Sequence, residues 1–178
     1  KDLRCKPPNH TLRHLLSHTA SGTPGTRFSY NPILYSWGSR PIMAAADAPF
    51  SSLVERYVLI PAGMGNSARK HRDLPLREDL AERQAQPYRI ENFGAIERSP
   101  ARPPQGDGAA GGVVSTVLDL ARFDIALDEG VLISAESRAA MMTPTKMSHG
   151  KTAPYGLGWY VQRYEGHTLV WHSGWWED

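Results

Sequence analysis

Two serine–lysine pairs have a spacing that acyl-transfer chemistry can use. They are Ser67 with Lys70 and Ser148 with Lys151, each in an S-x-x-K pattern. On a helix, this spacing places the lysine one turn after the serine, where it can keep the hydroxyl activated as a nucleophile. Neither pair lies in a sequence that predicts a buried helix: Ser67 follows two glycines in a polar segment, and Gly150 interrupts the second pair. We therefore expect both pairs to be surface residues.

Metal binding is a second chemistry that the sequence raises, at His14 and His18. A spacing of four residues on a helix would place both imidazoles on one face, as in a two-histidine metal site. The glutamate of an H-E-x-x-H motif is absent because Leu15 follows His14, and no third ligand is indicated. The simpler interpretation is that both histidines satisfy backbone groups near the following turn. A metal-dependent hydrolase using His14 and His18 therefore stays an alternative, and no metal is predicted.

The segment 11–30 has the pattern of a scaffold that could position a phenol. Leucines at helical spacing predict a short amphipathic helix at its start. Serine, glycine and proline between residues 21 and 25 end that helix and favour a turn. Phe28, Ser29 and Tyr30 follow the turn. A rigid helix that leads through a turn to Tyr30 could hold its hydroxyl in a cleft.

Four stretches of the chain resemble, in order, the motifs of the serine β-lactamase-related hydrolases. HLLSHTASG and the later F-S-Y are similar to that family's HLL-H-TSG and F-x-Y. The other three are PAGM at 61–64, AGGVVST with DL at 110–120, and YGLGW at 155–159 leading to HSG at 172–174. The family includes class C β-lactamases, low-molecular-weight penicillin-binding proteins, esterases and D-amino-acid peptidases. The resemblance covers nearly the whole chain.

The resemblance implies an acyl-enzyme mechanism and a set of site residues. By position, Tyr30 would be the family's proton-shuttling tyrosine. His172, Ser173 and Gly174 fall where the family has K-T-G or H-x-G on a strand. The backbone N–H of Trp175 would then be one oxyanion donor. We therefore expect Tyr30 and His172 to be catalytic and to face a common cleft, and residues 173–175 to bind the substrate.

Three features of the resemblance shape the functional hypothesis. His172 replaces a lysine that supplies a fixed positive charge in penicillin-recognising members, which favours an ester, amide or D-amino-acid peptide substrate over a β-lactam. Pro32 stands where the family's Y-x-N has asparagine, so no amide is offered there. The family's nucleophile precedes the HLL-H-TSG stretch and would lie before Lys1. We expect the chain to be inactive alone; a non-catalytic binding fragment or pseudoenzyme is the alternative.

The overall composition bounds the partners and the compartment. The net charge is +2 and the pI about 8.8, so nothing in the charge balance indicates nucleic acid or an anionic membrane. No apolar run is long enough to span a bilayer. The single cysteine, Cys5, cannot form an internal disulfide and leaves the compartment open. The chain shows no signal peptide and is expected to begin mid-protein, while the resemblance suggests a bacterial periplasm or cell envelope.

The predicted elements indicate an α+β fold. Helices are expected over residues 51–59, from Thr116 to Gly130 and over 134–142, and a hairpin is expected around Glu165-Gly166. We expect residues 1–178 to form part of one β-lactamase-related serine hydrolase domain, roughly 1–150 being mainly helical and 151–178 supplying strands of an antiparallel sheet. The expected partners are a small-molecule substrate and the remainder of the parent domain. No cofactor is implied.

Overall fold

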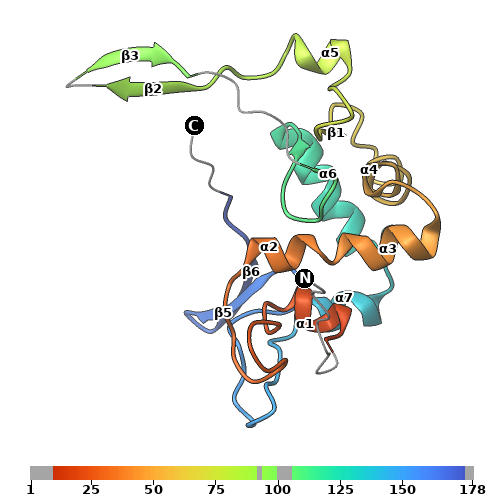
Figure 1. Ribbon diagram of the computed structural model, residues 1–178, viewed down its shortest axis with the longest axis vertical. Coiled ribbons are helices and arrows are strands. Elements are labelled where there is room, and N and C mark those ends of the chain that lie inside the picture. The colour runs from red at the N-terminus through yellow and green to blue at the C-terminus, as the bar shows by residue number, and fades with distance from the viewer. Residues whose placement is uncertain (1–9, 92–93, 100–105, 175–178) are drawn as a thin grey trace, which may run out of the picture. The chain divides into compact units, whose positions relative to one another are not determined.

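The computed structural model describes residues 10–91, 94–99 and 106–174 (Figure 1). The described chain divides into two compact units. Unit 1 contains residues 10–48, 108–110 and 133–172, and unit 2 contains the described residues of 49–107, 111–132 and 173–174. Both units combine helices with antiparallel strand pairs, so the predicted α+β class is confirmed.

Unit 1 is built from four helices and one hairpin. These are α1 (Leu12–Leu16), α2 (Pro32–Ser36), α3 (Ser39–Ala46), α7 (Ala135–Met141), β5 (Tyr160–Tyr164) and β6 (His167–Trp171). The Asn31 side chain accepts from the backbone N–H of Leu34 and caps α2, and Pro32 occupies its first turn. Ser134 caps α7 in the same way, through the N–H of Ser137.

Helix α1 ends earlier than the two-histidine hypothesis requires. Thr11 caps it by accepting from the N–H of His14, whose own Nδ1 accepts from the N–H of Thr11. The helix stops at Leu16, and His18 has a left-handed backbone with φ of 54°. The expectation that His14 and His18 share a helix face is therefore wrong. The chain turns before His18 is reached.

The β5–β6 hairpin confirms the turn predicted at Glu165-Gly166. The two strands pair antiparallel, from Tyr160 opposite Trp171 to Tyr164 opposite His167. Both turn residues have positive φ, 45° and 81°, as a two-residue type I′ turn requires. The pairing brings the Tyr160 and Trp171 rings into a stack with centroids 4.8 Å apart. The hairpin thereby fixes the position from which residue 172 leaves the strand.

Unit 2 contains three short helices, a π-helical turn and two strand pairs. These are α4 (Phe50–Val54), η1 (Glu55–Leu59), β1 (Ala68–Arg69), α5 (Glu78–Ala81), β2 (Tyr88–Glu91), β3 (Ala95–Arg98), β4 (Val113–Val114) and α6 (Val117–Asp128). β1 pairs with β4, and β2 pairs with β3. The helix predicted over 51–59 is present as α4 followed by η1. Pro49 occupies its cap position, and the N–H of Ser51 donates to Asp107 at 3.0 Å.

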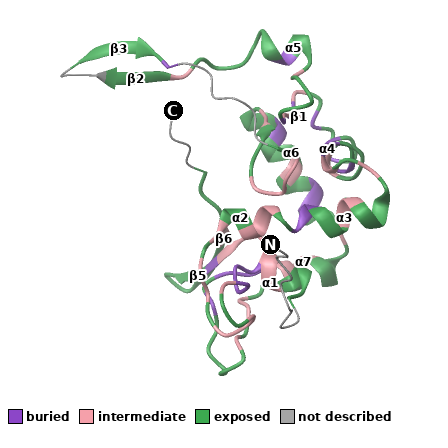
Figure 2. Cartoon of the chain, viewed as in Figure 1, coloured by how far each residue is buried: buried purple, intermediate pink, exposed green. Residues whose placement is uncertain are grey.

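The core of unit 2 lies where η1 and the turn after it pack against α6. Leu59, Ala62, Met64 and Ala126 are buried together, and Phe123 packs against them. Figure 2 shows buried residues on parts of α4 and α6, with other parts of both helices exposed. Burying one stripe of a helix in this way is what fixes it to its neighbours, since short helices are marginal alone.

Helix α6 begins as predicted, but its first acidic residue does something else. Thr116 caps the helix by accepting from the N–H of Asp119. Asp119 stands three residues after Thr116, where a capping-box residue would return a bond to the Thr116 N–H. Instead its carboxylate accepts from the N–H of Asn66 and the hydroxyl of Ser67, both at 2.7 Å. The helix terminus is therefore tied to the loop before β1.

Across the described ranges, none of the helices combines the length and apolar character needed to cross a bilayer. The longest is α6, with 12 residues.

Candidate active site

The structure brings Tyr30 and His172 together although they are far apart in the sequence. The Tyr30 hydroxyl lies 3.5 Å from His172 Nε2, and the ring centroids are 5.9 Å apart. Tyr30 lies in the loop between α1 and α2, and His172 directly follows β6. The Tyr30 side chain is 46% exposed. The pair thus belongs to one side-chain cluster that solvent can reach, as the order of the motifs led us to expect, while the roles of both residues stay predictions.

Aromatic rings surround Tyr30 on its inner side. We define the aromatic cluster as Tyr30, the four rings that contact it and two further rings that contact His18. The four are His18, Tyr155, Tyr160 and His172, and the two are Phe28 and Tyr35. The closest is His18, with its centroid 4.3 Å from that of Tyr30, and Tyr160 lies parallel to Tyr30 at 6.1 Å. Tyr155 is 1% exposed and contacts both. Ring contacts of this kind restrict how the Tyr30 side chain can turn.

The backbone on both sides of Tyr30 is bound to a single residue. The N–H of Ser29 donates to the carbonyl of His18 at 2.8 Å, and the N–H of Asn31 donates to His18 Nδ1 at 3.0 Å. An Nδ1 that accepts must lack a proton, so His18 is present with its proton on Nε2. Tyr30 is therefore held by its two neighbours as well as by ring packing.

Four residues of the cluster, His18, Tyr30, Tyr35 and Tyr155, are held in their uncharged forms near neutral pH. Burial, and then the neighbouring Tyr160 hydroxyl, raise the pKa of Tyr30. Burial also raises the pKa values of Tyr35 and Tyr155, with the other tyrosines adding to the effect. Burial, and then the nearby His172, lower the pKa of His18 to about 4. Tyr30 is thus a neutral phenol, which can relay a proton but is not a standing phenolate base.

Comparison with known proteins decides the family. The family model described as Beta-lactamase matches residues 3–177. The chain belongs to the Beta-lactamase family. The resemblance on the four motifs is therefore confirmed.

Individual relatives agree with this family. Penicillin-binding protein 4* of Bacillus subtilis (strain 168) is 41% identical over 73 residues, which are 40% of this chain and 16% of that protein. The structure of an octameric penicillin-binding protein homologue from Pyrococcus abyssi matches 84% of this chain and 33% of its own, with 25% identity and a TM-score of 0.65. That of D-amino acid amidase from Ochrobactrum anthropi SV3, complexed with L-phenylalanine amide, matches 90% and 56%, with 20% identity and a TM-score of 0.72.

These matches establish the fold and its extent. The chain has the β-lactamase and penicillin-binding-protein fold, as predicted, and covers only part of it. It spans less than two thirds of each of the relatives named here.

The remaining predicted site residues follow His172 in the chain. Ser173 and Gly174 are exposed and come directly after it. Trp175 lies outside the described residues. His172 lies one residue beyond the end of β6, so the structure places the three residues after the strand on which the motif is expected, and their roles stay predictions.

Neither serine–lysine pair has the geometry of a family nucleophile. Ser148 is exposed, as expected, and lies in a turn in which the N–H of Met147 donates to the carbonyl of Lys151. Ser67 was also expected on the surface, and that is wrong, because it is 3% exposed. Its hydroxyl is bonded to Asp119 and lies 2.8 Å from the Ser115 hydroxyl. The strand β1 follows Ser67, so the helical spacing to its lysine does not apply.

The two histidines of the metal hypothesis are both occupied by backbone groups. His14 Nδ1 accepts from the N–H of Thr11 at 3.2 Å, and His18 Nδ1 accepts from Asn31. The simpler interpretation is therefore confirmed for His18, whereas His14 binds the N–H of Thr11 at the start of α1 and not a group of the following turn. Within the part of the chain that the structure describes, no three His, Cys, Asp or Glu residues are grouped so that they could hold a metal ion.

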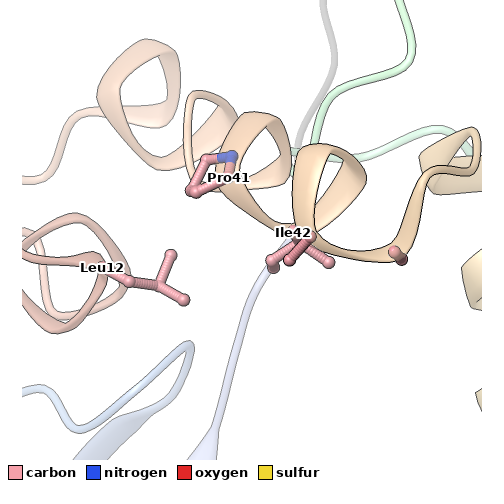
Figure 3. Close-up of a pocket in the computed structure, with 5 residues that line it drawn as sticks. Leu12, Pro41 and Ile42 are labelled. Atoms are coloured by element: carbon pink, nitrogen blue, oxygen red, sulfur yellow. The ribbon is translucent and has the colours of Figure 1, made fainter.

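An apolar groove lies elsewhere in unit 1, between α1 and α3 (Figure 3). It has a volume of about 400 Å³ and is lined by Leu12, Pro41, Ile42, Ala45 and Ala46. These side chains carry no group that could transfer a proton or bind an anion. This groove is therefore not a candidate for acyl-transfer chemistry, and the aromatic cluster stays the candidate site.

Proposed function

We propose that this chain is the part of a serine acyl hydrolase that supplies Tyr30 and His172 to the active site. The enzyme would act through an acyl-enzyme on an ester, an amide or a D-amino-acid peptide. The observation that carries this proposal is the approach of the Tyr30 hydroxyl to His172 Nε2, at 3.5 Å, on an exposed part of the aromatic cluster. Membership of the Beta-lactamase family supports it.

In this mechanism Tyr30 relays a proton between the serine nucleophile and the leaving group. When the serine oxygen attacks the carbonyl, its proton passes to the tyrosine oxygen as the phenolic proton moves on to the departing nitrogen or oxygen. The raised pKa of Tyr30 favours such a concerted relay over a free phenolate. His172 can accept a hydrogen bond from the Tyr30 hydroxyl or donate one to its oxygen, because an imidazole has both a donor and an acceptor form at Nε2. It thereby sets where the Tyr30 lone pairs point.

The nucleophilic serine, in this proposal, precedes Lys1. None of the serines in the described residues begins an S-x-x-K on a helix, and the two literal matches lie in a turn and before a strand. The backbone N–H of Trp175 would be one oxyanion donor, next to Ser173 and Gly174. The 178 residues alone would therefore not turn over a substrate, because oxyanion donors without a nucleophile give only a small residual rate.

The identity of residue 172 bears on the substrate. A lysine offers a compact fixed charge for a substrate carboxylate, whereas an imidazole does not. An ester or a neutral amide makes no demand for that charge. D-amino acid amidase, whose structure shares this fold, was solved with L-phenylalanine amide. We therefore place short esters and amino-acid amides before β-lactams as substrates.

The test compares the 178-residue chain with the same chain extended by its own preceding sequence. Both are offered a short-chain chromogenic ester, an amino-acid amide, a β-lactam and a fluorophosphonate probe. We expect probe labelling and turnover in the extended form alone. Tyr30→Phe in that form should lower kcat by about 10²- to 10⁴-fold. Tyr164→Phe, which removes another exposed tyrosine hydroxyl of unit 1, should leave it unchanged.

Other outcomes would contradict the proposal. Turnover by the 178 residues with labelling at Ser67 or Ser148 would make one of the literal S-x-x-K matches the nucleophile. Saturable binding of the amide by the extended form with no labelling would indicate a non-catalytic binding protein. Activity lost on adding a chelator and restored by zinc would favour the metal-dependent alternative at His14 and His18.

A further inference from the structure

We propose that His18 is the residue that positions Tyr30, holding the backbone on both sides of it and packing an imidazole against its ring. The catalytic consequence of this inference rests on the proposed function of Tyr30. Its structural content does not, because it concerns only the contacts between the two residues and their neighbours.

The first support is that His18 binds both neighbours of Tyr30. Its carbonyl accepts from Ser29 at 2.8 Å, and its Nδ1 accepts from Asn31 at 3.0 Å. The backbone carbonyl and the side chain of His18 thus bind the residue before Tyr30 and the residue after it. The residue between these two anchors is Tyr30. Its Cα is therefore fixed by bonds that do not involve its own side chain.

The second support is the backbone of His18 itself. Its φ of 54° lies in the left-handed region, which is unfavourable for a non-glycine residue. This conformation follows the end of α1 and turns the residue so that carbonyl and ring both reach the Tyr30 loop. The two hydrogen bonds offset that cost.

The third support is that the imidazole is itself held firmly. His18 is 3% exposed, and its ring is stacked on Tyr35 of α2 at 5.2 Å and meets the edge of Tyr155 at 4.9 Å. Against this fixed ring Tyr30 packs at 4.3 Å. A side chain whose own rotamer is locked by packing is what positions another with the accuracy that catalysis needs.

The arrangement also requires His18 to be neutral. The titratable groups that face it are the hydroxyls of Tyr30, Tyr35 and Tyr155 and the imidazole of His172. Burial and His172 lower its pKa to about 4, so the Nδ1 lone pair stays available at neutral pH. A proton on Nδ1 would replace the bond from Asn31 with a clash between two donors.

Two substitutions separate the acceptor from the rest of the histidine. His18→Asn keeps an acceptor oxygen close to the position of Nδ1, and asparagine tolerates a positive φ. His18→Ala removes the acceptor and the ring. In the extended, active form, we expect His18→Ala to lower kcat by about 30- to 100-fold with KM changed less than threefold, since a misplaced catalytic group costs about this much. His18→Asn should recover kcat to within about fivefold of the parent.

The matched control is His149→Ala. His149 is exposed in the same unit, and its Nδ1 likewise accepts from a backbone N–H, that of Lys151, at 3.3 Å. We expect this control to leave kcat and KM unchanged. Full kcat per folded molecule in His18→Ala, or a His18→Asn variant as impaired as His18→Ala, would overturn the inference.

A spectroscopic arm keeps the inference testable even if the proposed function fails. In the same polypeptide with ¹³C-labelled tyrosine and ¹⁵N-labelled asparagine, Tyr30→Phe identifies the Tyr30 signal. We expect His18→Ala to shift the signals of Tyr30 and of the Asn31 amide, and His18→Asn to restore the amide shift. Unchanged signals in His18→Ala would overturn the positioning role. Activity that survives Tyr30→Phe would instead sink the proposed function, with the spectra still deciding the role of His18.

Discussion

Unit 1 and unit 2 each contain a cluster of residues whose chemical types could support catalysis, and the two clusters differ in one respect that matters. The aromatic cluster around Tyr30 has hydroxyls and imidazoles. The Asp119 cluster of unit 2 has a carboxylate, two serine hydroxyls, an arginine and one backbone N–H, which belong to Asp119, Ser67, Ser115, Arg122 and Asn66. From residue types alone, the second is the better candidate for a nucleophile with a charged partner.

The centre of the Asp119 cluster is buried, although the Arg122 side chain at its edge is exposed. Asp119 is 0% exposed and accepts from Asn66, Ser67 and Arg122. Burial by itself opposes its charge, but the hydrogen bonds from Ser67, Asn66 and Arg122 outweigh burial and lower the pKa of Asp119. The Ser67 hydroxyl donates a hydrogen bond to this buried carboxylate. This cluster joins the loop before β1 to the start of α6.

The aromatic cluster is closed on one side and open on the other. His18 and Tyr155 are buried, whereas Tyr30 is 46% exposed and meets His172 at 3.5 Å, at the long end of hydrogen-bond distances. Hydrogen bonds between catalytic groups are often long when no substrate is bound, so this distance is compatible with the proposed role of the pair. The candidate site therefore differs from the Asp119 cluster in having an exposed polar group, Tyr30, packed against buried rings. The presence of an acid and serines alone does not make the Asp119 cluster a candidate site.

The largest stability effect should come from breaking the Asp119 cluster. We expect Asp119→Ala to lower the free energy of unfolding by about 2–4 kcal/mol, because Asn66 and Ser67 lose a charged acceptor inside the protein. Tyr30→Phe should lower it by less than about 1 kcal/mol. Urea unfolding of the two variants beside the parent measures both values.

The comparison would fail if Tyr30→Phe lowered the free energy of unfolding more than Asp119→Ala does. A Tyr30→Phe protein less stable than Asp119→Ala would make Tyr30 a structural residue. Asp119→Asn serves as the shape-matched control and should fall between the parent and Asp119→Ala, since it retains one acceptor oxygen.

The next effect is on the pH dependence of stability, and it separates the clusters by their pH windows. The pKa of His18 is lowered from 6.5 to about 4, so between these values the unfolded chain binds a proton that the folded chain does not. The contribution is fully present above pH 6.5 and is lost as the pH falls toward 4, by up to about 3 kcal/mol. The lowered pKa of Asp119 acts in the same direction, but below its ordinary value of 3.8.

Urea unfolding between pH 7.5 and 2.5 tests both windows. His18→Asn has no titrating imidazole and should flatten the decline in the upper window while leaving the fall below pH 3.8 in place. A decline between pH 6.5 and 4.5 that is equally steep in parent and variant would show that His18 titrates normally.

Much of the fold could be predicted because its signals are local. Thr116 caps α6 and Gly130 follows its end, as their positions in the sequence indicate, and Glu165-Gly166 forms the predicted hairpin turn. Each depends on the conformational preference of one or two residues within a few positions. The family motifs likewise pointed to the two residues, Tyr30 and His172, that the structure brings together.

What could not be predicted depends on residues distant in sequence. Ser67 lies in a polar segment and looks exposed, but it is buried because Asp119, 52 positions later, accepts its hydroxyl. His18 was assigned to the helix because nothing nearby forbids it; the bonds to Ser29 and Asn31 accompany its left-handed backbone. The hairpin of β2 and β3 was missed because its sequence is short and largely polar.

The smallest effect is expected for the S-x-x-K pattern of Ser148 and Lys151. It tests whether this pattern has any function when its residues do not lie on a helix. Ser148→Ala with Lys151→Ala removes both functional groups of an S-x-x-K pattern. The turn that holds them depends on backbone bonds, from Ser148 N–H to the Gly25 carbonyl and from Met147 N–H to the Lys151 carbonyl, which alanine also makes. Both side chains are exposed. We therefore expect less than about 0.5 kcal/mol of change in stability and no change in fluorophosphonate labelling of the extended form. Loss of labelling in this double variant would instead show that Ser148 is the nucleophile, and neither cluster would then contain the reacting serine.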